Sequence, residues 1–100
     1  MNKMWWLYLI QTCQKTIYTG ISTNPARRWQ QHQGKKSGGA KYLKAHRPHK
    51  IILLLPVGER RLAAQLEAQL KKLSHSQKKV LAAQMAAQSK KYFKQWQLNF

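Results

Sequence analysis

The chain has 100 residues, of which 43% are hydrophobic, and its 19 Lys and Arg against two acidic residues give a formal net charge of +17. This length corresponds to one domain with one core, and the hydrophobic content excludes a basic disordered tail. A positive field over most of the surface indicates a polyanionic partner. Nucleic acid is the first candidate and an anionic membrane the second, although no long basic amphipathic helix is apparent.

The single cysteine and the apolar start of the chain bear on its location. Cys13 stands alone, so it excludes an internal disulfide, and a lone cysteine is most often a small buried residue. A reducing, cytoplasmic setting is expected. Residues 1–10 are short, aromatic and without a small-residue cleavage site, so we interpret them as a strand and not as a signal peptide. No apolar run approaches the ~20 residues that span a bilayer, so no membrane association is expected.

Two runs rich in aromatic and β-branched residues predict a β-hairpin at the start of the fold. They cover residues 5–11 and 16–21 and flank a short polar break. Because successive side chains of a strand point to opposite faces, Tyr8 should share one face with its even-numbered neighbours. Leu7 and Leu9 should lie on the other face.

A helix, a basic loop and a short helix are predicted next. Asn24 is a suitable cap and Pro25 a suitable first residue for a helix that ends at Gly34. Residues 35–39 form a flexible, glycine-containing basic loop, and residues 40–46 a short helix that ends before a proline.

The second half of the chain predicts one strand and further helices. The unbroken apolar run at residues 50–56 indicates a central strand covered on both faces. Residues 59–73 carry a leucine stripe typical of a helix. Ser74 and Gln77 form a possible capping box for a last helix, which could continue past Ala87. This order predicts an α+β fold with a small antiparallel or mixed sheet flanked by helices.

A constellation of chemically active residues is spread over these elements. Each member alone has an ordinary structural explanation: a tyrosine in a strand packs, and a glutamate in a helix pairs with a lysine one turn later. Together, two phenols, a guanidinium, an imidazole and a carboxylate are suited to cutting a phosphodiester with one metal ion. The residues are Tyr8, Tyr18, Arg28, His32 and Glu67.

In its motifs and their order, the chain resembles the GIY-YIG nuclease superfamily, and in particular its small single-domain bacterial members of the UPF0213 type. The matching runs lie at residues 7–10, 18–28, 38–42, 47–48 and 67–74. The resemblance implies a three-stranded antiparallel sheet flanked by helices. We expect residues 1–80 to form the nuclease-like domain and residues 81–100 a basic, aromatic, helical C-terminal extension.

The resemblance also implies metal-dependent DNA hydrolysis and a role for each member of the constellation. Glu67 would hold one Mg²⁺ or Mn²⁺ ion, since hard cations prefer oxygen ligands. Arg28 would brace the phosphate oxygens with its planar fork. Tyr18 would orient or deprotonate the attacking water and Tyr8 would position water or phosphate, although the choice of base between them stays open. His32 would relay a proton or order a tyrosine hydroxyl.

The basic loop and the short helix after it are predicted to grip DNA, with the tyrosine stacking on a base. The residues are Lys35, Lys36, Lys41, Tyr42, Lys44 and Arg47. The predicted function is a DNA endonuclease that selects single strands, flaps or branches in repair, recombination or processing, with a protein partner or homodimer as a possible source of targeting. The alternative is a noncatalytic basic nucleic-acid-binding module, which the charge alone supports equally. The C-terminal extension could enlarge the DNA surface, pack on the domain or form a dimer contact.

Overall fold

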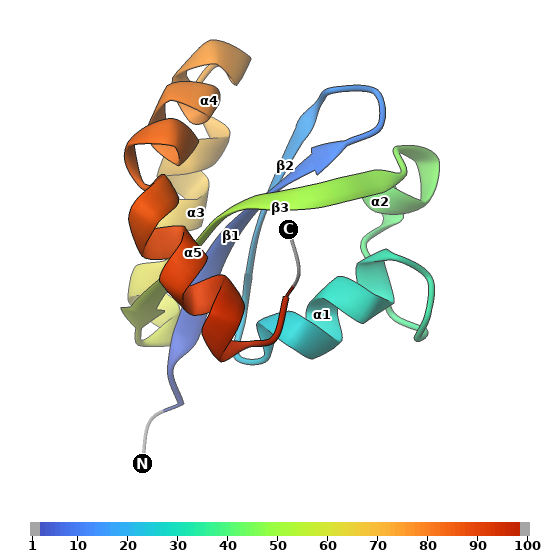
Figure 1. Ribbon diagram of the computed structural model, residues 1–100, viewed down its shortest axis with the longest axis horizontal. Coiled ribbons are helices and arrows are strands. Elements are labelled where there is room, and N and C mark those ends of the chain that lie inside the picture. The colour runs from blue at the N-terminus through green and yellow to red at the C-terminus, as the bar shows by residue number, and fades with distance from the viewer. Residues whose placement is uncertain (1–2, 99–100) are drawn as a thin grey trace.

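The computed structural model describes residues 3–98 and has the element order ββααβααα. Its one sheet is three-stranded and antiparallel, with the order β2-β1-β3. The strands are β1 (Trp5–Thr12), β2 (Ile17–Ser22) and β3 (Pro48–Gly58). The helices are α1 (Pro25–His32), α2 (Lys41–Ala45), α3 (Arg60–Lys71), α4 (His75–Gln84) and α5 (Ala86–Gln95). The predicted α+β fold, a small antiparallel sheet flanked by helices, is therefore confirmed (Figure 1).

Helices cover both faces of the sheet. The even-numbered side chains of β1, including Tyr8 and Ile10, pack with residues of α1, α2 and α5. Leu7 and Leu9 point the other way and pack with residues of α3 and α4. The predicted alternation along β1 is therefore confirmed, and it divides the core into two halves. The half that contains Tyr8 also holds the other candidate catalytic residues that precede β3.

The prediction that the apolar run at residues 50–56 is the central strand is wrong. β1 occupies the centre, and β3 lies at an edge. The run misleads because helices cover both faces of the sheet, so an edge strand here is as apolar as a central one. Pro48 and Pro56 both lie within β3, where an edge position tolerates the missing N–H groups. The backbone N–H of Leu54 donates a 3.1 Å hydrogen bond to Oγ of Ser89 on α5, so this helix partly covers the edge.

The helix caps form at the residues that the sequence predicts, whereas the last part of the chain forms two helices in place of one. Oδ1 of Asn24 caps α1, and Pro25 is its first residue. Ser74 and Gln77 form both bonds of the capping box, at 3.1 and 2.9 Å. The last helix, for which a continuation past Ala87 was left open, ends at Met85, where φ is −100° and ψ is 12°, and a separate helix follows. This break allows α4 to pack on one face of the sheet while α5 packs on β3 and the other face.

The C-terminal helix completes the core on the face that contains Tyr8. The indole of Trp6 meets Tyr92 and Trp96 edge to face, with ring centroids 5.2 and 5.6 Å apart. Of the three roles considered for the extension, the structure shows packing on the domain. The proposed division at residue 80 stays a prediction, and the ends of its two parts, residues 1–2 and 99–100, lie outside the described residues.

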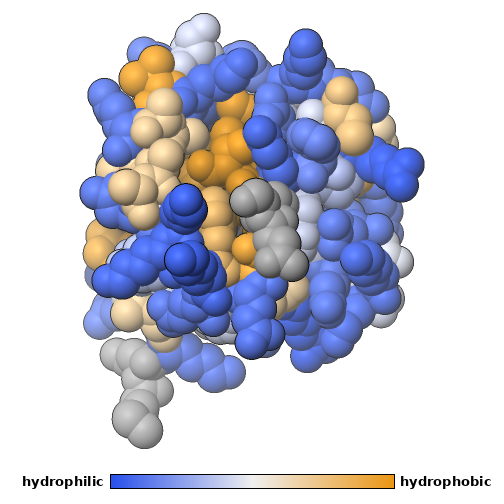
Figure 2. Space-filling view, viewed as in Figure 1, coloured by the Kyte–Doolittle hydropathy of each residue, from blue (hydrophilic) through white to orange (hydrophobic). Residues whose placement is uncertain are grey.

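The surface is largely hydrophilic, and an apolar band is visible near the middle of the face in Figure 2. The expectation that Cys13 is buried is wrong: it is exposed in the hairpin turn, where its backbone N–H donates to the carbonyl of Arg47 at 2.8 Å. Within the described part of the chain, no helix is both long and apolar enough to cross a membrane.

Candidate active site

Tyr8 occupies the space left by a glycine on the neighbouring strand. The two strands place Tyr8 directly opposite Gly20, and the tyrosine is only 3% exposed. A Cβ atom on Gly20 would overlap the phenol ring and its hydroxyl. Gly20 therefore allows Tyr8 to lie flat over β2, toward Tyr18 two residues earlier on that strand.

A buried hydrogen bond joins Tyr8 to His32 at the end of α1. Oη of Tyr8 lies 2.8 Å from Nε2 of His32, and the other ring nitrogen, Nδ1, accepts the backbone N–H of Ala40 at 3.2 Å. A neutral imidazole has one donor and one acceptor nitrogen, so Nε2 carries the hydrogen and donates to Oη of Tyr8. The hydroxyl hydrogen of Tyr8 is then left to donate elsewhere.

Burial keeps this cluster uncharged. Desolvation, reinforced by the charge of Arg28, lowers the pKa of His32 to about 4. Desolvation and then the nearby Tyr18 raise the pKa of Tyr8 far above its ordinary value, with Arg28 acting in the opposite direction. Burial also raises the pKa of Tyr18, again opposed by Arg28. At neutral pH the site therefore contains a neutral imidazole and two protonated phenols beside one guanidinium.

One backbone carbonyl of the loop at residues 35–39, here called the glycine loop, and one side chain of α1 hold Arg28 in place. Its Nη1 donates to the carbonyl oxygen of Gly38 at 2.6 Å and to Oε1 of Gln31 at 3.0 Å. Both hydrogens of Nη1 are thus used, and those of Nε and Nη2 are left for Tyr8 and a phosphate. A Cβ on Gly39 would overlap the carbonyl oxygen of Gln31, so the loop packs on α1 without a side chain between them.

Sequence reasoning missed these supporting groups: Gln31, the Gly38 carbonyl and the Ala40 N–H. The paired glycines were the available signal, and the sequence analysis used them as part of a flexible basic loop and of a matching motif run, without inferring a close approach to α1. The structure shows that they allow the loop to approach α1, which brings one backbone acceptor to Arg28 and one backbone donor to His32.

Glu67 lies on α3, which packs against β2, the strand that carries Tyr18. Its charge raises the pKa of both Tyr8 and Tyr18, so the carboxylate lies within electrostatic range of both hydroxyls. Glu67 is 23% exposed and forms an ion pair with Lys71 at 3.7 Å, the pairing that a purely structural role predicts. That distance is long, and the pair uses Oε2 alone.

The donor set fits one hard divalent cation held by a single carboxylate. Among residues 3–98, no three His, Cys, Asp or Glu side chains gather as a metal cage. Mg²⁺ commonly uses one or two carboxylates and completes its shell with water and substrate phosphate oxygens. Glu67, half-buried and near two phenols, can act as such a ligand.

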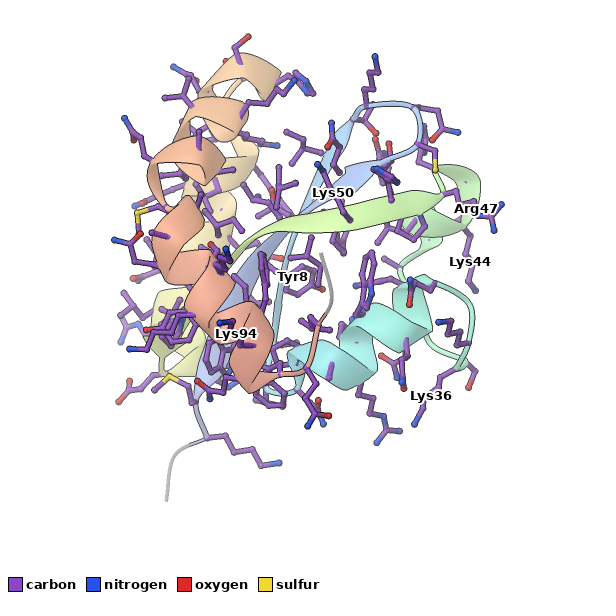
Figure 3. The ribbon with its side chains drawn as sticks, in the orientation of Figure 1. Tyr8, Lys36, Lys44, Arg47, Lys50 and Lys94 are labelled. Atoms are coloured by element: carbon purple, nitrogen blue, oxygen red, sulfur yellow. The ribbon has the colours of Figure 1, made fainter. Side chains whose placement is uncertain are left out.

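The predicted DNA-gripping residues fall into several places. Lys36, Lys44 and Arg47 line one cavity beside His32, and Figure 3 shows all three on the side of the molecule away from Lys94. Lys35 lines a different cavity, between α1 and the chain after α5. Lys41 is exposed at the start of α2.

Tyr42 belongs to a stack of rings that extends outward from Tyr18. Its ring lies 6.0 Å from that of Tyr18 and 4.2 Å from that of His46, nearly parallel to both. Its hydroxyl donates to Oγ1 of Thr16 at 2.9 Å, which holds the ring against the hairpin. Tyr42 is 39% exposed, and its stacking on a base stays a prediction.

Residues 4–80 match the family described as the GIY-YIG catalytic domain, and the chain belongs to this family of nucleases. It is similar to the UPF0213 protein YhbQ of Escherichia coli strain K12, with 44% identity over 82 residues that cover 82% of this chain and 80% of the relative. The corresponding protein of Escherichia coli O157:H7 is 43% identical over 86 residues, or 86% of this chain and 84% of the relative. No solved structure shows a significant match.

Proposed function

We propose that this chain is a divalent-metal-dependent DNA endonuclease whose catalytic residues are Tyr8, Tyr18, Arg28, His32 and Glu67. The observation that carries the proposal is the cluster around the buried Tyr8–His32 bond, where Arg28 lowers and Glu67 raises the pKa of both phenols. These residues come from β1, β2, α1 and α3, and a protein that only binds DNA would not require them to converge.

Tyr8 and His32 act in this proposal as a fixed donor unit. Nε2 of His32 donates to Oη of Tyr8, so the phenol directs its own hydrogen toward a phosphate oxygen or the attacking water. The high pKa of Tyr8 keeps that hydrogen in place. His32 orders the hydroxyl and does not take its proton, because its Nδ1 is already occupied by the Ala40 N–H.

Tyr18 is the better candidate for the group that accepts a proton from the attacking water. It is less buried than Tyr8, so a negative charge on its oxygen loses less solvation. Arg28 opposes the increase in the pKa of Tyr18 that burial causes, and neutralising the charge of Glu67 would remove another cause of it. The Nε and Nη2 donors of Arg28 that Tyr8 does not use are available for the non-bridging oxygens, where negative charge develops as water attacks phosphorus.

A divalent cation held by Glu67, Mg²⁺ or Mn²⁺, would supply positive charge to the phosphate and to the leaving oxygen. The chain's own contribution is to place Glu67 near both phenols. Loss of this carboxylate should therefore abolish cleavage without weakening DNA binding, because a negative charge is removed from a strongly basic surface.

We further propose selection by DNA structure or strandedness, with single-stranded, flap or branched DNA as the substrate in repair, recombination or processing. A surface whose contacts are mostly cationic recognises phosphates, which fix the register but carry no sequence information directly. In this proposal the protein works in the cytoplasm, and a protein partner or a second copy of the chain supplies additional targeting.

The test compares single-stranded, duplex and branched DNA in Mg²⁺, in Mn²⁺ and in chelator. Glu67→Gln should abolish cutting, whereas Glu59→Gln, which removes the other acidic residue, should leave it intact. Binding without cutting of any substrate in either metal would refute the nuclease proposal and support the noncatalytic alternative.

A further inference from the structure

A cavity of about 660 Å³ borders the candidate active site at His32. It lies between the C-terminal end of α1, the glycine loop and the segment that joins α2 to β3. Its volume is typical of pockets that hold small ligands. Three cationic side chains from different segments line it: Lys36, Lys44 and Arg47.

No acidic residue lines this cavity. The chain has only two acidic residues, Glu59 before α3 and Glu67 within it. In the part of the chain that the structure describes, the one ion pair formed is between Glu67 and Lys71. The three cations of the cavity therefore have no protein counter-charge, and an anion from outside would be strongly favoured there.

The cavity is joined to the catalytic cluster through two residues. His32 lines the cavity while its Nε2 donates to Tyr8. Gly38 also lines it, and its carbonyl oxygen accepts the bond from Arg28. An anion in the cavity would thus lie beside two residues that contact the catalytic cluster directly.

We propose that the cavity is a subsite for one uncleaved phosphate of the substrate strand, close to the phosphate that is cut. This inference rests on the proposed nuclease function and adds a register-setting contact to it. Arg47 offers a planar fork for two phosphate oxygens, and Lys36 and Lys44 add point charges. The ligand is either an internal phosphodiester or a terminal phosphate, since both present the same oxygens.

The test measures binding and not cleavage, so it does not depend on the nuclease proposal. Glu67→Gln protein is titrated in chelator with fluorescent single-stranded DNA in which one phosphate at a time is replaced by a neutral methylphosphonate. The subsite predicts that one position near the middle of the bound segment weakens affinity more than its neighbours. This position effect should vanish when Lys36, Lys44 and Arg47 are all changed to Gln.

Salt dependence gives a second, quantitative readout. Each phosphate neutralised on a single strand contributes about 0.7 to the slope of log affinity against log salt. If the three cations share one phosphate, the triple variant lowers that slope by about 0.7. If they contact three separate phosphates, the slope falls by about 2. A fall of about 2 without any position effect would overturn the proposal.

A matched control removes three cations elsewhere, by changing Lys79, Lys90 and Lys94 to Gln on α4 and α5. This control should keep the position effect. Lys44→Gln alone should reduce the position effect. Because Lys44 is exposed, this single variant is expected to fold normally, so it tests the subsite even if the triple variant misfolds. Strands that end at the critical position with and without a terminal phosphate distinguish the two sources: a terminal preference appears as tighter binding of the phosphorylated end.

Discussion

The hydroxyl of Tyr8 illustrates how one buried bond fixes the chemistry of a residue. Because the Ala40 N–H occupies Nδ1 of His32, the imidazole must donate to Tyr8 and not accept from it. The hydroxyl of Tyr8 is therefore a hydrogen-bond donor to other groups, and the backbone N–H of Ala40 determines this role through His32. Burial reinforces this assignment by disfavouring both the imidazolium and the phenolate.

Removing the Tyr8 hydroxyl should affect both stability and activity. Tyr8→Phe leaves the Nε2–H of His32 buried without its acceptor, which typically costs about 1–3 kcal/mol of unfolding free energy. Loss of the donor should also reduce cleavage by about 100-fold or more. Urea unfolding and DNA cleavage assays measure the two effects. Tyr18→Phe, at a half-buried position, should reduce cleavage with little loss of stability, and equal destabilisation by both variants would contradict this assignment.

The lowered pKa of His32 predicts how stability depends on pH. The ordinary imidazole value is 6.5, and burial followed by the charge of Arg28 lowers it to about 4 in the folded protein. Between these values the unfolded chain binds more protons than the folded one, so stability is full above about 6.5 and is lost as pH falls toward about 4. The loss amounts to at most about 3 kcal/mol.

Urea unfolding at several pH values between neutrality and pH ~4 measures this loss. Replacing His32 with Gln should flatten the pH dependence, whereas replacing the exposed His75 with Gln should preserve it. An unchanged slope in the His32 variant would show that other groups account for the acid sensitivity.

At the scale of elements, the segment from Gly38 to Ala40 behaves as a backbone clamp on α1. Its first carbonyl holds Arg28 and its last N–H holds His32, while Gly39 between them lies too close to Gln31 for any side chain. Lys35 and Lys36 lie shortly before this segment and Lys41 directly follows it, and all three are proposed to contact DNA. The proposed DNA contacts and the orientation of two proposed catalytic side chains are therefore carried by one short stretch of chain.

Gly39→Ala should separate these two functions. The added methyl group pushes the loop away from α1, so Arg28 and His32 lose their backbone partners while every positive charge remains. We expect kcat to fall by at least about 10-fold with little change in DNA affinity. Nitrogen-15 chemical shifts of the His32 ring should change from a single Nε2–H tautomer to a mixture. Gln30→Ala, on the exposed side of α1, is the control, and an unchanged tautomer in Gly39→Ala would refute the clamp.

A side-chain hydroxyl of α5 satisfies one backbone N–H group of the edge strand β3. Ser89 is 1% exposed and accepts the backbone N–H of Leu54, so Ser89→Ala leaves a buried donor unpaired. The expected cost is about 1–3 kcal/mol of unfolding free energy, read from urea denaturation. Ser76→Ala at an exposed position of α4 should change stability by less than about 0.5 kcal/mol. A similar small value for Ser89→Ala would mean that water replaces the hydroxyl.

At the scale of the whole molecule, the C-terminal helix is part of the hydrophobic core and is needed for the stability of the fold. Truncation after Met85 removes Tyr92 and Trp96, whose rings pack edge to face on Trp6. We expect the truncated protein to be unfolded or to lose several kcal/mol of stability, since burial of one large aromatic side chain contributes about 1.5–3 kcal/mol. Circular dichroism melting tests this. A stable truncated protein would instead support a domain that ends near residue 80.

Local patterns predicted the features that depend on neighbours in sequence. Alternation along β1 placed Tyr8 and Leu9 on opposite faces, and the cap residues Asn24 and Ser74 marked helix starts that the structure confirms. Spacing on α1 likewise brought Arg28 and His32 to one side. These outcomes follow because strand and helix periods act over a few residues.

Features that depend on packing between distant segments were not predictable in this way. The central position of β1 follows from which strand pairs with both others, and the apolar run of β3 contains no information about that. The break at Met85 arises because α5 must reach the opposite side of the sheet from α4. The backbone partners of His32 and Arg28 have no side-chain signature of their own, and the paired glycines beside them indicate a close approach without showing which groups meet.

The scarcity of acidic residues has a consequence for the protein as a thermodynamic system. With one ion pair among the described residues and a net charge of +17, the folded state concentrates positive charge that its own side chains do not balance. A polyanion that binds the native surface relieves this repulsion and shifts the folding equilibrium by mass action. Bound nucleic acid then neutralises the charge of the folded state, and we expect the DNA-bound protein to be more stable against unfolding than the free protein.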